Sequence, residues 1–280
     1  MSEYHCLVAG LPDISFDANK LSFTVENFKS EIYPLLTADD AAKIDLFFYG
    51  WDNANIIKIL KQGSDAELSR VGKFDAEQIA ELIDAAKCGD GCPKPFPSYM
   101  YDFLVYYFEN EGREDILFED ALAGRYYDYA TRCGNSFLES WFTFNRNINN
   151  LQVAFLARKY KMNMSECIVG DDETSETIRN SASRDFGLAG TIDYLEQVLR
   201  LCESDKLQER ERQMDELRWN WLEDNSIFNY FTIERIYVFL QKLDIVTRWT
   251  KLDTETGAKR YKELIDGLKS GLTINDEDYQ

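Results

Sequence analysis

One segment of the sequence, residues 136–161, constrains the fold more than any other. Its large apolar residues recur at steps of 4, 3, 4, 3 and 4 positions: Phe137, Trp141, Phe144, Ile148, Leu151 and Phe155. This spacing puts all of them on one stripe of an α-helix, whereas the two-residue period of a strand would divide them between two faces. We therefore predict a single helix over residues 136–161, with Ser136 as its N-cap.

Three asparagines lie inside this predicted helix: Asn147, Asn149 and Asn150. Asparagine is a poor helix former because its side chain competes for backbone hydrogen bonds. Either these amides simply face water, or they bind partners elsewhere in the fold.

Apolar residues recur at helical spacing in the rest of the chain as well. The predicted helices lie between Val25 and Leu35 (disturbed at Pro34), Thr37 and Gly63, Asp75 and Gly89, Phe103 and Gly112, Asp115 and Cys133, Leu188 and Cys202, Leu207 and Leu222, Ile233 and Leu243, and Tyr261 and Leu268. Thr37 and Asp75 are predicted N-caps. The helix after Leu207 has only a thin apolar stripe and should be mostly exposed. No stretch alternates with a period of two, so the sequence predicts an all-α protein.

Two segments divide the chain into expected units. Residues 93–97 are proline-rich, and residues 170–176 are acidic without an apolar residue, which predicts a solvated loop. We expect an N-terminal unit over residues 1–92, a central unit over 93–170 and a C-terminal unit over 171–280. These units can also pack tightly as one domain.

The chain is strongly acidic. Its 280 residues include 50 Asp and Glu against 31 Lys and Arg, a formal net charge of -19. Such a field opposes binding to nucleic acids and to anionic membranes. No apolar run approaches the roughly 20 residues that cross a bilayer, and the start lacks the features of a signal peptide. We expect a cytoplasmic protein without direct membrane insertion, whose contact with a membrane goes through a partner.

The sequence lacks the common motifs of enzyme sites. It has no GxxxxGK[ST] loop, HExxH or GxSxG motif, and His5 is its only histidine. We therefore expect no catalysis, metal or cofactor. Cys88 and Cys92 form the one close cysteine pair, but a zinc site would need further ligands nearby. We favour a glycine-rich turn with free thiols there.

Tyrosines gather in two places along the chain. They are Tyr99, Tyr101, Tyr106 and Tyr107, and then Tyr126, Tyr127 and Tyr129. Helical spacing favours core packing for about half of them, and the others are candidates for a protein interface.

Two short elements of the chain resemble each other. Asp52 and Asn147 each precede an asparagine by three residues, and that asparagine (Asn55 or Asn150) is followed by a branched aliphatic residue. Both elements lie inside predicted helices. They resemble the recurring Asp-x-x-Asn-Leu…Arg element of the central-stalk subunit of V-type and archaeal-type rotary ATPases. That subunit is called C in bacteria and archaea and d in eukaryotes.

Further residues extend this resemblance. Arg158 occupies the arginine position of the second element, and the segment from Tyr237 to Arg248 is similar to the C-terminal element of that subunit. The opening residues 4–13, followed by Asp52 and Asn55, resemble a bacterial family of unknown function. The genes of that family accompany those of V-type ATP synthase subunits, and this second resemblance covers nearly the whole chain.

The resemblance implies a funnel-like, all-α arrangement of pseudo-repeated helical units. It also implies a non-catalytic rotor adaptor, which couples the shaft subunits to the membrane rotor ring in ion transport, peripheral to the inner membrane. Asn55, Asn150 and Arg158 are then expected to brace neighbouring helices. The chain departs from the pattern at Asn147, which replaces Asp, and at Gly63, near the arginine position of the first element. A helical scaffold or regulatory protein-binding module is the alternative function.

Overall fold

The computed structural model describes residues 4–63, 65–113 and 116–272, with the side chains of residues 165 and 253–272 left undescribed. Within these ranges the chain is helical and contains no strand, as predicted. The helices are α1 (His5–Ala9), α2 (Val25–Asn27), α3 (Ala38–Gln62), α4 (Ala76–Cys88), α5 (Ser98–Glu109), α6 (Phe118–Ala130), α7 (Ser136–Tyr160), α8 (Met164–Cys167), α9 (Glu173–Asn180), α10 (Leu195–Cys202), α11 (Leu207–Asn225) and α12 (Ile233–Leu272). A π-helical turn (Phe28–Ile32) and a 3-10 turn (Tyr33–Leu35) follow α2.

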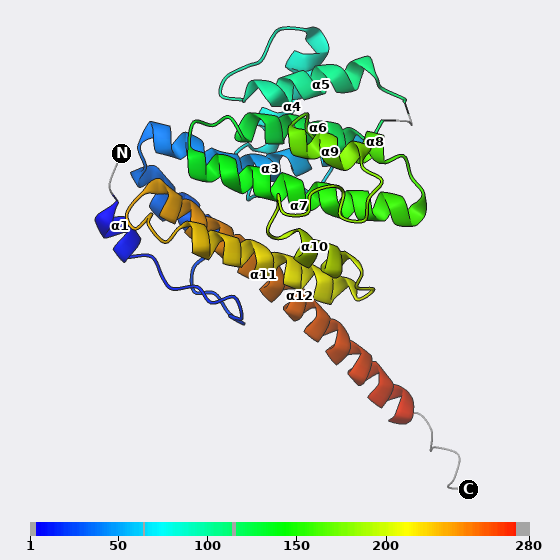
Figure 1. Cartoon of the computed structure of the whole chain (residues 1–280). Coiled ribbons are helices and arrows are strands. Elements are labelled where there is room, and N and C mark those ends of the chain that lie inside the picture. Colours follow the sequence, from blue (N-terminus) through cyan, green and yellow to red (C-terminus); the bar gives the residue numbers. More distant parts are fainter. Residues whose placement is uncertain (1–3, 64, 114–115, 273–280) are drawn as a thin grey trace, which may run out of the picture.

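The helices stack in layers, and the order of the layers differs from the order of the chain. In Figure 1, α4 and α5 form one end of the stack, α3, α6 and α7 its middle, and α10, α11 and the first half of α12 the other end. The second half of α12 extends away from the body. The start of the chain lies beside the α11–α12 connection, where the Tyr4 N–H donates to the Phe231 carbonyl at 2.7 Å.

One hydrophobic core connects the three expected units. Phe48 of α3, Ile148 of α7 and Tyr237 of α12 are all buried in it. Full burial of such side chains contributes about 1.5–3 kcal/mol each. A smaller cluster of Trp219, Ile245, Val246 and Trp249 packs against residues near the start of the chain, among them Phe16. The long apolar stripe of α7 therefore lies at the centre of the molecule.

Several helix ends are those that the sequence predicts. The Thr37 and Asp75 side chains accept hydrogen bonds from the backbone three residues later, and Gly63 and Gly89 end α3 and α4 with positive φ angles. The predicted N-cap of α7 is wrong. The cap is Asn135, whose side chain accepts from the Leu138 N–H, and Ser136 is the first helical residue. Asparagine and serine are nearly equal as caps, so the sequence alone did not separate them.

Two other predictions are wrong. Residues 170–176 are not a solvated loop, because Asp172 caps α9 and Ser175 is fully buried. The predicted separate helices over residues 233–243 and 261–268 belong to one helix, α12, of 40 residues. Gly257 lies between the two predicted helices. A single glycine costs a helix only about 1 kcal/mol and need not end it.

The N-terminal and charged helices also differ in part from expectation. The helical region around residues 25–35 has a regular α-helix only over Val25–Asn27 before it changes to π and 3-10 turns around Pro34. The charged helix α11 buries more than a thin stripe, because Asp215 and Trp219 are buried along with Met214. Asp115 and the acidic residues 273–280 lie outside the described residues.

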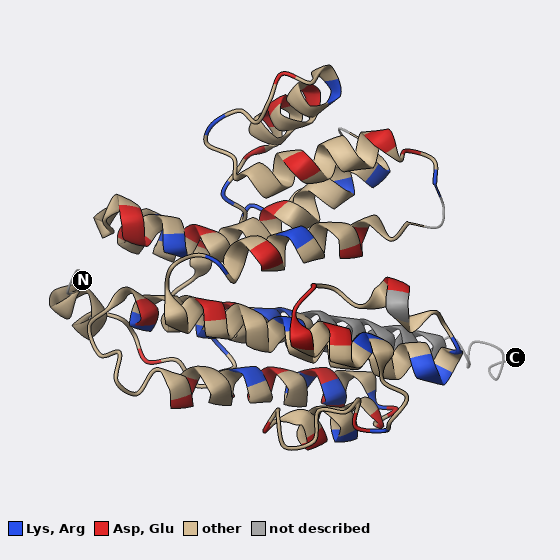
Figure 2. Cartoon of the chain, turned by 45° about the horizontal axis from the view of Figure 1, so that its top comes forward, with Lys and Arg blue, Asp and Glu red and all other residues tan. Residues whose placement is uncertain are grey.

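Acidic and basic residues intermix over the helices (Figure 2). None of the described helices is both long enough and apolar enough to span a membrane.

Candidate functional site

Asn55 holds the chain that follows α3 by both of its amide atoms. Its Nδ2 donates to the Ser69 carbonyl at 2.9 Å, and its Oδ1 accepts from the Ser69 N–H at 2.8 Å. Asp52 lies one turn earlier on the same helix face. Its carboxylate accepts from the N–H groups of Lys73 and Phe74 at 3.0 and 3.1 Å. We call this set of contacts the first asparagine clamp.

Asn150 makes the same kind of contact on α7. Its Nδ2 donates to the Val169 carbonyl at 2.7 Å, and its Oδ1 accepts from the Val169 N–H at 3.0 Å. A third partner, the Ser175 hydroxyl of α9, lies 3.2 Å from Nδ2. We call this set the second asparagine clamp. The mid-helix asparagines therefore have tertiary partners, and Asn150 does not face water.

The two clamps share their local surroundings. Each asparagine lies on a helix of 25 residues and binds one residue of the segment that follows. In each case that segment leads into a helix with an aspartate N-cap, Asp75 for α4 and Asp172 for α9. Two elements that are alike in sequence thus make alike backbone contacts.

The clamps differ at the position three residues before the asparagine. We call the segment that follows each of these two helices its returning segment. Asp52 binds the returning segment of α3, but Asn147 does not bind that of α7. The Asn147 Nδ2 lies 3.4 Å from the Tyr194 hydroxyl, and its buried Oδ1 has no hydrogen-bond partner among the described residues. An amide cannot accept two N–H bonds as readily as a carboxylate does. The exchange of Asp for Asn therefore accompanies the loss of this contact.

Arg158 fixes a later part of the second returning segment. Its guanidinium donates to the carbonyls of Ser183 and, at 2.7 Å, of Ser181, and it lies 3.7 Å from the ring centre of Phe186. We expected Asn55, Asn150 and Arg158 to brace neighbouring helices. Their partners are instead mainly backbone groups of the returning segments, which offer free N–H and C=O groups that helix interiors lack.

In the first clamp a lysine from another element donates hydrogen bonds to the returning segment. The Lys29 Nζ donates to the Gly72 carbonyl and, at 3.1 Å, to the Val71 carbonyl. This contact comes from the π-helical turn rather than from α3. Gly63, near the position of the expected arginine, ends the helix.

Tyr237 and Arg248 lie on α12 and have different surroundings. Tyr237 is fully buried and accepts a hydrogen bond from Gln241 at 2.9 Å. Arg248 forms an ion pair with the buried Asp215 of α11, which also accepts from the Trp249 Nε1 at 2.9 Å. The structure thus keeps these two residues apart from both clamps.

A buried polar network continues from Asp215 towards α7. Asp215 pairs with Arg218 at 3.0 Å, and Arg218 donates to Asn145 at 3.0 Å. Asn149 donates in turn to the Tyr127 hydroxyl of α6 at 2.8 Å. Sequence reasoning missed Asp215 and Arg218 because they lie in a segment whose composition is typical of an exposed helix.

Two carboxyl groups, those of Asp52 and Asp244, have a pKa above the ordinary value for aspartate. Burial raises the pKa of Asp52 to about 6, although its two N–H donors and the nearby Lys29 and Lys73 oppose the shift. Burial also raises the pKa of Asp244 to about 6, with Arg248 opposing and Asp215 reinforcing the shift. Near pH 7 both groups are therefore charged at a cost to the folded state.

We predict that the free energy of unfolding rises as the pH falls from 7 towards 4.5. The folded protein takes up a proton at Asp52 near pH 6, whereas the unfolded chain does so only near the ordinary pKa of 3.8, so protonation favours the folded state in between. The difference between these two pKa values of Asp52, about 6 and 3.8, corresponds to about 3 kcal/mol of added stability when the carboxyl group is fully protonated. Urea unfolding at a series of pH values measures it.

Two variants test this pH dependence. Asp52→Asn should reduce the rise in stability by the share of Asp52 and leave that of Asp244, and the exposed Asp171→Asn serves as a control of equal charge change. An unchanged pH slope in Asp52→Asn would contradict the assignment of the effect to this carboxyl group.

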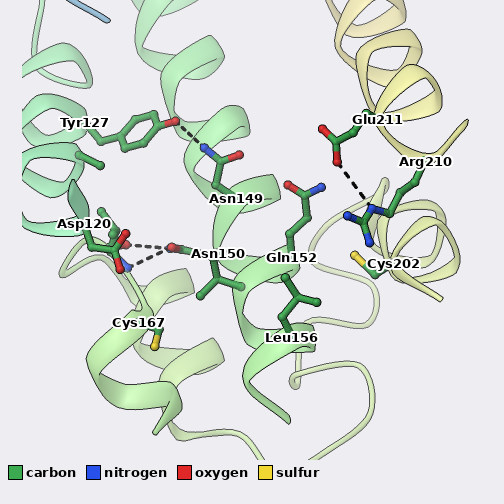
Figure 3. A pocket seen from close by; sticks show the side chains of 13 residues that line it. Asp120, Tyr127, Asn149, Asn150, Gln152, Leu156, Cys167, Cys202, Arg210 and Glu211 are labelled. Atoms are coloured by element: carbon green, nitrogen blue, oxygen red, sulfur yellow. Dashed lines mark hydrogen bonds and ion pairs between the residues drawn. The ribbon is translucent and has the colours of Figure 1, made fainter. Parts of the chain in front are cut away.

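A cavity of about 370 Å³ adjoins the second clamp (Figure 3). Asn149 and Asn150 of α7 line it, together with residues from α6, α10 and α11 and from the segment around Val169. Figure 3 shows Asp120 on one side of the cavity and Arg210 on the other, with Gln152 between them. The cavity thus lies between the central and the C-terminal parts of the stack.

The other residues that the sequence singled out have the following positions. Cys88 and Cys92 are exposed free thiols, Cys88 at the end of α4 and Cys92 in the α4–α5 connection, where Gly89 and Gly91 have positive φ angles. Among the described residues no group of three or more His, Cys, Asp or Glu could hold a metal ion. Tyr99 is buried and bonds to Asn53 at 3.0 Å, whereas Tyr129 is 40% exposed.

The comparison with known families agrees in part with the second resemblance, the one to a family of unknown function. A family model described as "Protein of unknown function (DUF2764)" matches residues 1–272. The chain belongs to this family. No curated protein and no solved structure matches the chain. The matched range includes both asparagine clamps, Arg248 and the cavity.

Proposed function

We propose that this chain is the non-catalytic central-stalk adaptor of a V-type rotary ATPase. It would couple the shaft subunits to the membrane rotor ring during ion transport, at the membrane but not in it. The pair of asparagine clamps carries the proposal. The two elements that resemble the Asp-x-x-Asn element of the C/d subunit are those that hold the segments after α3 and α7. This likeness of contacts supports repeated helical units.

The mechanical properties of the fold support the same role. An adaptor that transmits torque must resist twisting and bending. The helices α3 and α7, of 25 residues each, are about 38 Å long at the usual rise per residue, and they pack in a common core. The Asp215 network adds polar contacts between α11 and α12 at the edge of that core.

Co-expression with the shaft and ring subunits of a V-type ATPase from the same organism tests the proposal. We expect affinity purification through a tag on the chain to recover the shaft, and native mass spectrometry to give one copy of each. We also expect the ring to be recovered with a tagged shaft only when the chain is present.

The control is the same purification without the chain. Shaft and ring that join each other equally well in its absence, with the chain found alone at every concentration, would overturn the proposal.

A helical scaffold for another protein is the second candidate function. On the tyrosine-rich helices α5 and α6, Tyr99 and Tyr126 bond within the body, whereas Tyr129 is 40% exposed. The most exposed aromatic residue lies in the α11–α12 connection, where Phe228 is 89% and Tyr230 64% exposed. If the purification above recovers neither shaft nor ring, the replacement Phe228→Ser would test whether this connection binds another partner.

A further inference from the structure

The cavity beside the second clamp has mainly apolar walls. They are formed by Ala123, Val153, Leu156, Cys167, Val169 and Cys202. Its volume of about 370 Å³ falls within the range of small-molecule sites, which is about 300–1,000 Å³. Apolar walls with a few converging polar groups are typical of such sites.

Three polar side chains of this cavity have no side-chain hydrogen bond among the residues that the structure describes. Neither the Asp120 carboxylate nor the Gln152 amide has a hydrogen bond or ion pair within the part of the chain that the structure describes. The buried Arg210 Nε has no hydrogen bond there, and it forms only a loose ion pair with Glu211, at 3.6 Å. By contrast, both side-chain amide atoms of Asn150, on the same wall, already form hydrogen bonds in the clamp. The buried Arg210 Nε costs about 1–3 kcal/mol without a hydrogen bond, whereas Asp120 and Gln152 are partly exposed and offer free polar atoms to a ligand that enters the cavity.

The charges of these groups specify the ligand. Burial, with Glu119 beside it, raises the pKa of the Asp120 carboxyl, and a cation at Asp120 would offset that cost. Arg210 and Gln152 can both donate to a carboxylate. In Figure 3, Asp120 and Arg210 lie on opposite sides of the cavity, and the partly exposed, apolar Leu156 lies below Gln152 in this view. An anion at Arg210 would compete with Glu211, whose side chain is 38% exposed and would then face solvent.

We propose that this cavity binds a small zwitterion of the ω-amino-acid class, whose charged groups are separated by an aliphatic chain, with its ammonium group on Asp120 and its carboxylate on Arg210 and Gln152. The aliphatic part of the ligand would lie against the apolar walls. This site is independent of the proposed rotor function and would add a metabolite-sensing role to it. Because its walls come from α6, α7, α10 and α11, a bound ligand would stabilise the contact between the central and C-terminal helices.

Three probes of matched length test this site in the full chain: ε-aminocaproate, n-hexylamine and hexanoate. Titration calorimetry and thermal unfolding at constant ionic strength measure the binding of each probe. We expect ε-aminocaproate to bind most strongly, n-hexylamine to bind at least about tenfold more weakly, and hexanoate not to bind. Equal effects of all three probes, or no binding by ε-aminocaproate, would overturn the proposal.

Variants assign the two ends of the ligand. Asp120→Asn should weaken ε-aminocaproate binding at least about tenfold, and Arg210→Gln should reduce its affinity to that of n-hexylamine. Both changes remove groups that make no hydrogen bond within the described protein, so both variants should fold, which circular dichroism verifies. Asp171→Asn, outside the cavity, is the matched control. Binding that is the same in Asp120→Asn and the control would also overturn the proposal.

Discussion

Replacement of Gly72 with alanine should lower the free energy of unfolding by about 2–4 kcal/mol, one of the largest effects of any single methyl group in this chain. A Cβ atom at this position would lie 2.2 Å from the Asp52 Oδ1 and 3.2 Å from the Asn55 Nδ2. Asp52 is fully buried and accepts two backbone N–H bonds, so its carboxylate cannot turn away without losing them. The alternative is a shift of the returning segment, which would break the bonds of Asn55.

Urea unfolding monitored by circular dichroism measures this effect, and two further variants make it specific. Gly50 lies on α3, and a Cβ atom there would meet only the Tyr126 hydroxyl, at 3.7 Å. We expect the control variant Gly50→Ala to be neutral or stabilising by up to about 1 kcal/mol, because alanine is the better helix former. In the double variant Asp52→Ala with Gly72→Ala, the alanine at residue 72 should cost much less than it does alone. Additive costs would show that the clash with Asp52 is not the cause.

The long helices could be predicted because their apolar residues repeat over many turns. The stripe from Phe137 to Phe155 admits only a helix, and it lies at the centre of the fold as α7. Short helices carry less information. The buried residues of α9 are Ser175 and Ile178, which form no apolar pattern, and Ser175 is buried because it bonds to Asn150 and Val169. Such burial depends on contacts between distant segments, so it cannot be predicted from local periodicity.

The polar sites were predictable to a similar, limited degree. Asparagines inside a helix signal that their amides need partners, and Asn150 has them. The sequence did not reveal that the partner is a single residue of the returning segment, because that depends on where the segment passes. Asp215 gave no signal at all. Its charged neighbours indicate an exposed helix, and only the packing of α11 on α12 brings Arg248 and Trp249 to it.

Asn150→Leu should also destabilise the chain strongly, by about 2–4 kcal/mol. Leucine has a similar size but cannot bind the Val169 N–H, which would be left without its partner inside the fold. The Val169 carbonyl would keep the Ser175 hydroxyl, at 3.0 Å. Asn55→Leu removes the corresponding bonds of Ser69. If the two clamps play equivalent structural roles, the two variants should lose similar stability by urea unfolding.

Hydrogen exchange distinguishes local clamps from general weakening. We expect Asn150→Leu to accelerate amide exchange mainly over residues 167–180, and Asn55→Leu mainly over residues 66–75, because each clamp holds only the segment that follows its own helix. Asn225→Leu is the control, since Asn225 is exposed at the end of α11 and bonds only locally, to the Trp221 carbonyl. Faster exchange over the whole chain in both clamp variants would mean that the asparagines support the common core rather than two separate units. That result would remove the structural support for repeated units, and with it the main argument for a rotor adaptor.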